Sequence, residues 1–482
     1  MARGRSRRTL AVLAAAAVLV VVAGGVTAYV MLRTIGSPQQ TAATYLSAWQ
    51  RGDYHAMDQV TVDQPHGGLA GPLTQAATQL GVKHLRLVPG QESTVSGTTV
   101  AAFRATASLA SGQVWAYQGR LALVERNQHW WVDWSPADIY PGLHPGQRFV
   151  LDAVWPSRAP VLAADGTDIS SQAAQAQSGS LSLLTGIIVN ATKAQAKALG
   201  APYQAGDLVG EGGVEQAYQA QLAGRPSMTI KVEGPGAHVD AVAATFKGAP
   251  GTAVHTSIDM RVQLAASDAV RTAPTKKPVD MVAIQPSTGK VLAVVESPGG
   301  FDRALSGLFP PGSTFKIVTA SALTRTGMRP SSTVDCPPQT TIDGRTFHNF
   351  DNEQFGRVSL LKAFAVSCNT TFAMLATQRL NGDTLASMAA KFGFNAQPSL
   401  GIPATLGHFT TPKSPVDLAA DAFGQDTDLV NPLSEATMAG AIEDGTWRPP
   451  VLVTSPAPKQ TAQPQRISAA ILATLRPMMR AV

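Results

Sequence analysis

The most informative stretch of the sequence is Phe309-Pro310-Pro311-Gly312-Ser313-Thr314-Phe315-Lys316, which leads from a predicted loop into an apolar helix. Ser313 and Lys316 are three residues apart, so on a helix they share one face. A serine hydroxyl becomes a good nucleophile only when a neighbouring base takes its proton. Lys316 can be that base where burial lowers its pKa, and the flanking Phe315 and Ile317 supply apolar surroundings. The stretch predicts a serine nucleophile with a lysine base.

The Ser-x-x-Lys spacing is a weak signal alone, because it occurs at two other places in the chain. Ser287 lies in the turn of a predicted hairpin, where serine needs no function. Ser359 opens a predicted helix and is expected to be its N-cap. A plain N-cap is also the alternative for Ser313.

A second group of polar residues, Ser367-Cys368-Asn369, follows 54 residues after Ser313 and is the only Ser-x-Asn in the chain. It lies between two predicted helices, residues 359–366 and 370–380. A second hydroxyl can relay a proton toward a leaving amine, and an Asn amide can hold a peptide carbonyl. The alternative for Asn369 is that it caps the second helix.

The two cysteines, Cys336 and Cys368, do not form a metal-ligand pattern. In an oxidising compartment the pair is either a disulfide or two buried thiols. The chain also contains no HExxH, no P-loop and no GxGxxG followed by a helix. We therefore expect no metal and no nucleotide cofactor.

The sequence predicts three domains, and the motifs described above lie in the last of them. A helix from Asp259 to Val270 and a hairpin of residues 281–284 and 291–295 begin the last domain, residues 256–482. Residues 145–255 follow a Pro/Gly-containing linker and include a predicted strand at 149–154 and a helix at 214–223. Residues 38–137 start with an amphipathic helix around residues 42–49 and continue as alternating strands from Thr98, the last being residues 130–134. This pattern predicts a multidomain α+β protein.

The N-terminus combines positive charge with an apolar run. Residues 10–32 carry no charge and are long enough to span a bilayer as a helix, which would leave residues 1–9 as a cytoplasmic tail. The alternative is a cleaved signal peptide with Val26-Thr27-Ala28 as the processing site. Both place the body outside the cytoplasm. Five arginines lie before residue 34, and removing them leaves 33 basic residues against 32 acidic, so we expect no nucleic-acid partner.

The two motifs together resemble those of class B penicillin-binding proteins, the serine acyltransferases of the β-lactam-interacting fold. The hairpin around Gln285-Pro286-Ser287-Thr288-Gly289 and the loop Phe423-Gly424-Gln425 are similar to other parts of that family. Residues 38–137 resemble the nuclear-transport-factor-2-like (NTF2-like) cone domain of the methicillin-resistance type. Residues 145–255 resemble the family's pedestal or dimerisation domain. The last domain resembles the β-lactamase/transpeptidase-like α/β sandwich.

The resemblance implies a peptidoglycan D,D-transpeptidase of the cell membrane that acts on stem peptides and binds β-lactams, with other cell-wall synthesis proteins as candidate partners. It assigns Ser313 as nucleophile, Lys316 as base, Ser367 as proton relay and Asn369 as substrate-binding residue. No cofactor is implied. The family's third motif, Lys-Thr-Gly or Lys-Ser-Gly, is absent from the 482 residues. We therefore expect a truncated transpeptidase domain that does not turn over substrate as written.

Two other functions remain open from the sequence. A serine β-lactamase or D,D-carboxypeptidase shares the Ser-x-x-Lys motif, although the predicted anchor and two preceding domains disfavour a lactamase. A non-catalytic scaffold of the cell-wall machinery is the alternative from a different class, because the third motif is missing.

Overall fold

The structure, a computed structural model, describes residues 36–300 and 302–482, which form two compact units. Unit 1 contains residues 36–155, 195–204 and 226–249, and unit 2 contains 156–194, 205–225 and 250–482. Residues 145–255, which we predicted as one domain, therefore contribute to both units. The predicted membrane span at residues 10–32 lies outside the described residues. Within the described part, none of the helices has both the length and the apolar character that a bilayer crossing requires.

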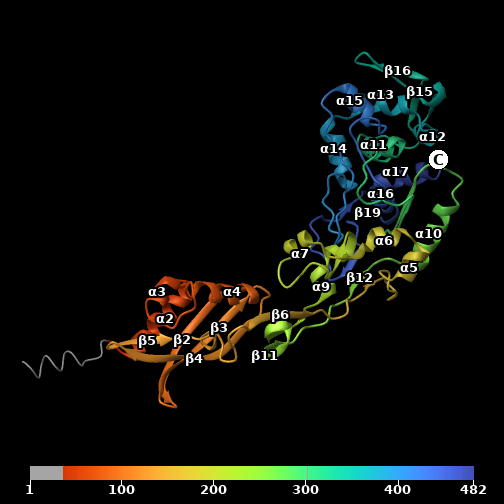
Figure 1. Cartoon of the computed structure of the whole chain (residues 1–482). Helices are drawn as coiled ribbons and strands as arrows, with labels where there is room; N and C mark the ends of the chain where they lie inside the picture. The colour runs from red at the N-terminus through yellow and green to blue at the C-terminus, as the bar shows by residue number, and fades with distance from the viewer. Residues whose placement is uncertain (1–35, 301) are drawn as a thin grey trace, which may run out of the picture. The chain divides into compact units, whose positions relative to one another are not determined.

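Unit 1 packs three helices on one face of a five-stranded sheet (Figure 1). The helices are α2 (Pro38–Arg51), α3 (Tyr54–Asp58) and α4 (Ala70–Leu80). The strands, in sheet order, are β1 (Thr61–Val62), β5 (His129–Asp133), β4 (Val114–Arg126), β3 (Thr98–Leu109) and β2 (Val82–Val95). Alternate side chains of β3 and β4, such as Phe103 and Leu121, are buried against the helices. The predicted helix followed by an antiparallel meander is confirmed.

The sequence pattern did not indicate strands β1 and β2 of this sheet, and β2 is the longer of the two. Its pairing with β3 is interrupted between Val82 and His84 and again between Pro89 and Glu92. Each interruption shifts the side chains between the two faces, so the alternation of apolar and polar residues is lost along the strand.

A second sheet of unit 1 has the order β11–β10–β6, with antiparallel pairing throughout. Its strands are β6 (Arg148–Val154), β10 (Ser227–Glu233) and β11 (Val239–Phe246). Alternate residues of β10, including Ile230 and Val232, are fully buried in the same core as the helices of unit 1.

The part of unit 2 nearest the N-terminus consists of short elements around Val214 and Leu222, which are both fully buried. They are β7 (Val161–Leu162), α5 (Gln172–Gln177), α6 (Ser180–Thr185), β8 (Ile187–Asn190), α7 (Lys193–Leu199, which runs from unit 2 into unit 1), β9 (Leu208–Glu211), α8 (Gly213–Ala217) and α9 (Gln219–Ala223).

The predicted helix at residues 214–223 is wrong in one respect, because it is broken at Tyr218, whose φ is −113°. Arg158 donates a hydrogen bond of 2.9 Å to the main-chain oxygen of Glu215, the acceptor that a continuous helix would use itself.

The larger part of unit 2 begins with β12 (Val254–Thr256), α10 (Met260–Thr272) and a hairpin of β13 (Val279–Gln285) and β14 (Lys290–Ser297). Met281 pairs with Val295 across the hairpin, as the sequence predicts. The remaining helices are α11 (Lys316–Arg325), α12 (Leu360–Ala365), α13 (Asn369–Arg379), α14 (Gly382–Lys391), α15 (Pro415–Asp421), α16 (Pro432–Asp444) and α17 (Ala469–Met479). The remaining strands are β15 (Thr333–Cys336), β16 (Gln339–Ile342), β17 (Arg345–His348), β18 (Gly356–Ser359), β19 (Thr446–Trp447), β20 (Val453–Ser455) and β21 (Gln465–Arg466).

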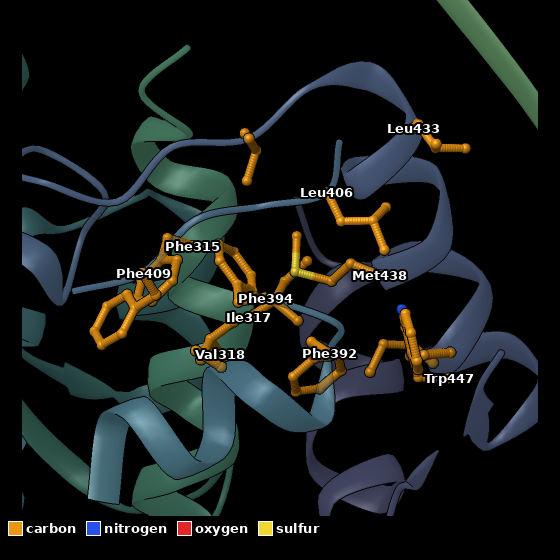
Figure 2. Packing of buried hydrophobic residues seen from close by; sticks show 14 of the residues in the cluster. Phe315, Ile317, Val318, Phe392, Phe394, Leu406, Phe409, Leu433, Met438 and Trp447 are labelled. Carbon is orange, nitrogen blue, oxygen red and sulfur yellow. The ribbon is translucent and has the colours of Figure 1, made fainter. Parts of the chain in front are cut away.

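Helix α11 is the centre of this part and is buried along almost its whole length. It contacts α13, α14 and α17. Just before it, Phe315 stacks on Phe409, with ring centroids 5.3 Å apart, and meets Phe394 edge-on at 5.4 Å (Figure 2). This aromatic cluster anchors the beginning of the helix in the core, between Ser313 and Lys316.

Replacing Phe315 with alanine should destabilise unit 2 by about 3–5 kcal/mol, because the change removes a fully buried ring and leaves a cavity. Phe350 is the matched control. It is 78% exposed, and its replacement by alanine should change stability by no more than about 0.5 kcal/mol. Denaturant unfolding of the two variants measures the difference. Equal losses would show that Phe315 does not hold the helix.

Candidate active site

The turn that carries Ser313 begins at a glycine whose backbone conformation is unusual for other residues. Gly312 has a φ of 58°, in the left-handed region that favours glycine. Residues Gly312–Phe315 form one turn of 3-10 helix, and α11 follows directly at Lys316. Ser313 makes no side-chain capping bond to either helix, so the N-cap alternative does not describe it.

Ser367 lies in the tight connection between α12 and α13. Its φ of 57° is unusual for a residue with a side chain and costs about 1–2 kcal/mol. The next residue, Cys368, forms a disulfide with Cys336 in the structure and is almost fully buried. The buried disulfide holds the connection between α12 and α13 in the core, and the neighbouring Ser367 remains exposed at the surface.

Asn349 also holds the connection between α12 and α13 in place. It is 6% exposed, and its amide donates to the main-chain oxygens of Pro337 at 2.8 Å and Glu353 at 2.9 Å. Its Oδ1 accepts the N–H of Thr370 at 3.1 Å, at the start of α13. The connection is thus tied to the loop that precedes it, and Asn369 donates to the main-chain oxygen of His348 at 3.2 Å.

The structure brings all four predicted residues together. Lys316 Nζ lies 2.9 Å from Ser313 Oγ, 2.9 Å from Ser367 Oγ and 2.7 Å from Asn369 Oδ1. It also donates to the main-chain oxygen of Ser367 at 2.8 Å. The Ser367 hydroxyl donates to Ser313 Oγ at 2.6 Å. The Asn369 side chain does not cap α13, so the N-cap alternative fails for it as well.

Lys316 has four polar contacts, and a neutral amine can use three of them in hydrogen bonds. A neutral amine has two N–H groups and one lone pair, and the Ser367 main-chain oxygen and Asn369 Oδ1 are acceptors for the two N–H groups. The lone pair is then free to accept the hydroxyl hydrogen of Ser313, while Ser313 Oγ accepts from Ser367. Every polar hydrogen of this group has a partner in that arrangement.

Burial explains why the amine loses its proton. The Lys316 side chain is 1% exposed, and this removal from water lowers the pKa of its ammonium group from 10.5 to about 7. Ser313 and Ser367 are exposed, and both line a cavity of about 300 Å³ together with apolar side chains such as Ile317 and Phe364. The site therefore places the solvent-accessible hydroxyl of Ser313 next to the buried amine of Lys316.

The other two Ser-x-x-Lys matches do not form such a site. Ser287 lies in the turn between β13 and β14, as predicted. The Ser359 hydroxyl accepts the N–H of Lys362 at 3.1 Å and caps α12, as predicted. In the described ranges, no group of three or more His, Cys, Asp and Glu side chains is placed to hold a metal ion.

Two family descriptions match the chain. Residues 280–482 match the penicillin binding protein transpeptidase domain, and residues 37–147 match the NTF2-like N-terminal transpeptidase domain. The chain contains two domains of the kinds found in penicillin-binding proteins. Both matches agree with the resemblance that the motifs indicate, and the serine–lysine site lies within the transpeptidase domain.

The relatives that this chain resembles include two curated enzymes. Peptidoglycan D,D-transpeptidase PbpA of Mycolicibacterium smegmatis is 34% identical over 245 residues, which cover 42% of this chain and 49% of that protein. PbpA of Mycobacterium tuberculosis is 32% identical over 240 residues, which cover 41% of this chain and 48% of that protein. This chain spans about half the length of the curated relatives it matches.

A solved structure shows the same fold as this chain. Penicillin-binding protein PBP2 of Helicobacter pylori, solved in complex with MreC, superposes with a TM-score of 0.58 at 15% identity. The superposition covers 69% of this chain and 84% of that chain. The multidomain α+β fold predicted from the sequence is confirmed.

Sequence reasoning missed the residues that support the site from a distance. Asn349 is one, and the buried carboxyl groups of Asp421 and Asp428 are two more. The available signal was an aspartate within the apolar run Leu418–Phe423, because a charged residue in such a run has an unusual environment.

Proposed function

We propose that this chain is a peptidoglycan D,D-transpeptidase that forms an acyl-enzyme on Ser313. The observation that carries the proposal is the contact between an exposed serine hydroxyl and the buried amine of Lys316, whose pKa is about 7. A base with a pKa near the working pH is effective in proton transfer. The relatives named peptidoglycan D,D-transpeptidases support the substrate class, stem peptides ending in D-Ala-D-Ala.

In the acylation step, Ser313 Oγ attacks the carbonyl carbon of the penultimate D-Ala while Lys316 takes the hydroxyl proton. The bond between that carbon and the nitrogen of the last D-Ala then breaks. The proton passes from Lys316 through the Ser367 hydroxyl to the departing amine, since Ser367 Oγ contacts both Lys316 Nζ and Ser313 Oγ. The products are free D-Ala and an ester on Ser313.

In the second step, an amine from a neighbouring stem peptide attacks the ester and Ser313 recovers its proton. The result is a new amide, the cross-link, and a free enzyme. Asn369 positions the donor peptide through its amide, which lies beside Lys316. A β-lactam acylates the same serine, because its strained amide takes the place of the D-Ala-D-Ala bond. Both steps consist of acyl and proton transfer, so the proposal includes no cofactor.

The location and partners of the protein are proposed with the same function. The uncharged segment of residues 10–32 anchors the chain in the cytoplasmic membrane, and the arginines before it keep the N-terminus inside the cell. The two units then lie on the outer side, where the peptidoglycan is. Other cell-wall synthesis proteins are the proposed protein partners.

Labelling with a fluorescent penicillin tests the function. The chain should gain one adduct mass, and peptide mapping should place that adduct on the peptide with Ser313. The peptides with Ser287 and Ser359 serve as internal controls, because both have the same Ser-x-x-Lys spacing. An adduct that survives the digestion favours a transpeptidase over a serine β-lactamase. A chain that is acylated at another serine would refute the role of Ser313, and a chain that is never acylated would refute the proposal and favour the scaffold.

A further inference from the structure

The disulfide between Cys336 and Cys368 is a buried cross-link beside the site, and the proposed mechanism does not use it. Cys336 ends β15, Cys368 lies between Ser367 and Asn369, and the two cysteines are 0% and 1% exposed. The chain contains no other cysteine. The disulfide therefore ties the residue in the middle of the Ser-x-Asn motif to a strand that lies 32 residues earlier in the chain.

Both chain neighbours of Cys368 contact the base. On one side, the main-chain oxygen of Ser367 accepts from Lys316 Nζ at 2.8 Å, and Ser367 Oγ lies 2.9 Å from the same nitrogen. On the other side, Asn369 Oδ1 accepts from Lys316 Nζ at 2.7 Å. Three of the four polar contacts of Lys316 therefore come from the two residues that flank one half of the disulfide.

Ser367 has a backbone conformation that its surroundings must impose. Its φ of 57° lies in the left-handed region, which a residue with a side chain keeps only where the structure around it is firmly held. Its N–H donates to the main-chain oxygen of Phe364 at 2.9 Å, and the N–H of Cys368 donates to that of Ala363 at 2.9 Å, so one side of the connection is fixed to α12. The disulfide at the next residue supplies the covalent constraint on the other side.

The start of α13 has further links to β15 that do not depend on the disulfide. The Thr371 hydroxyl donates to the main-chain oxygen of Asp335 at 2.7 Å, and the Thr370 hydroxyl donates to that of Pro337 at 2.7 Å. Both threonines belong to the helix, so these bonds hold the helix in place and not Ser367. We therefore expect the chain to stay folded when the disulfide is reduced.

Reduction changes the space that the two sulfur atoms need. A dithiol supplies two electrons and two protons, the S–S bond breaks, each cysteine becomes a thiol, and the dithiol becomes a disulfide. Two sulfur atoms that are no longer bonded must move apart to van der Waals contact. Both belong to a closely packed core cluster that includes Phe364 and Phe372, so the chain beside them has to shift. Ser367 is the neighbour whose unfavourable backbone conformation is released by such a shift.

We propose that the disulfide between Cys336 and Cys368 holds Ser367 and Asn369 against Lys316, and that the chain with both thiols reduced stays folded but is acylated slowly. The two cysteines act through Ser367 and Asn369, so they are positioning residues. The inference rests on the proposed function for its effect on acylation. Its effect on the backbone around Ser367 is independent of any activity. Because the bond forms in an oxidising compartment, the site is completed only after the chain has left the cytoplasm.

Reversible reduction of the full chain is the first test. The protein is incubated with dithiothreitol until two thiols titrate, freed of the reductant and labelled with a fluorescent penicillin. A displacement of about 1 Å at a reacting group can cost about 10²-fold, and Ser367 remains two residues from the end of α12, so we expect a smaller loss of about 10-fold in the labelling rate. Reoxidation with glutathione disulfide should restore the rate. A chain that has two thiols and is labelled at the oxidised rate would overturn the inference.

Cys336→Ala removes the disulfide without changing the Ser-x-Asn motif. It should be labelled as slowly as the reduced chain, and the double variant with Cys368→Ala should lose no more, because the single and the double change remove the same bond. The control is Val334→Ala. Val334 lies two residues earlier on β15 and is 6% exposed, so its truncation weakens the same strand and leaves the disulfide intact. It should be labelled at close to the wild-type rate. An equal loss in this control would show that stability is the cause and would overturn the inference.

The pH dependence of labelling separates a displaced site from a loss of folded protein. Burial lowers the pKa of Lys316 to about 7, and no charged side chain of the described residues contributes to this change. If Ser367 and Asn369 move away, water reaches the amine and its pKa rises toward its usual value. The midpoint of the rate profile should therefore move above about pH 7 in Cys336→Ala and in the reduced chain. A lower rate with an unchanged midpoint would overturn the inference.

Amide hydrogen exchange tests the same inference without any activity. The N–H groups of Ser367 and Cys368 are bonded to main-chain oxygens of α12, and their exchange should become at least about 10-fold faster on reduction. The hairpin of β13 and β14 serves as the internal control and should exchange as before. Unchanged exchange at Ser367 and Cys368 would overturn the inference. A chain that is not acylated in either redox state contradicts the proposed function, and the exchange rates then decide on the disulfide alone.

Discussion

Replacing Lys316 with methionine should lower the rate of acylation by penicillin about 10²–10⁴-fold, the usual contribution of a positioned base. Methionine keeps much of the length and the apolar stem of lysine but cannot accept a proton. Because Lys316 is 1% exposed, and because the ring of Phe372 lies 5.8 Å from its Nζ, the substitution should be accommodated in the core. The measurement is the second-order rate of labelling with a fluorescent penicillin, compared with that of the wild type.

The matched control for this substitution is Lys362→Met. Lys362 belongs to another Ser-x-x-Lys sequence, but it is exposed and its partner Ser359 caps a helix. Its replacement should leave the rate within about twofold of wild type, in line with the small effects of surface substitutions. If Lys316→Met is acylated at the wild-type rate, another group takes the proton of Ser313 and the proposed mechanism is wrong.

The four site residues could be predicted from the sequence because the relevant relations are local or motif-based. Ser313 and Lys316 are one helical turn apart, and that spacing places their side chains on one face in any helical conformation. Ser367 and Asn369 belong to one short motif between two predictable helices. What the sequence could not supply was the distance between the two motifs, which depends on how α11 packs against α13.

Non-local contacts explain what the sequence analysis did not predict. The expected helix is broken at Tyr218, and there the main-chain oxygen of Glu215 accepts a hydrogen bond from Arg158, which lies 57 residues away. Strand β2 is hidden by two irregularities in its pairing. In each case a contact made only in the folded chain decides the local structure.

Replacing Gly424 with alanine should have the second large effect, because Gly424 lies in the loop after α15 and its main-chain oxygen accepts the N–H of Gly312, the residue before Ser313. Its φ is 79°, and a Cβ there would collide with the main-chain oxygen of Gly312. Neither backbone can yield without moving the other, since the N–H of Gly312 is bonded to the oxygen of Gly424. A displacement of about 1 Å at a reacting group can reduce the rate about 10²-fold, and we expect a loss of that size in penicillin labelling.

Gly327→Ala separates the collision from simple backbone strain. Gly327 follows α11 and has a φ of 92°, but no heavy atom lies within 4 Å of the position that its Cβ would take. Its replacement should cost about 1–2 kcal/mol of stability, the price of a left-handed conformation, and should leave the labelling rate close to wild type. Gly424→Ala should lose both stability and labelling. If the two variants lose only the same amount of stability and both retain labelling, the loop at Gly424 does not position Ser313, and the support for the nucleophile must come from α11 alone.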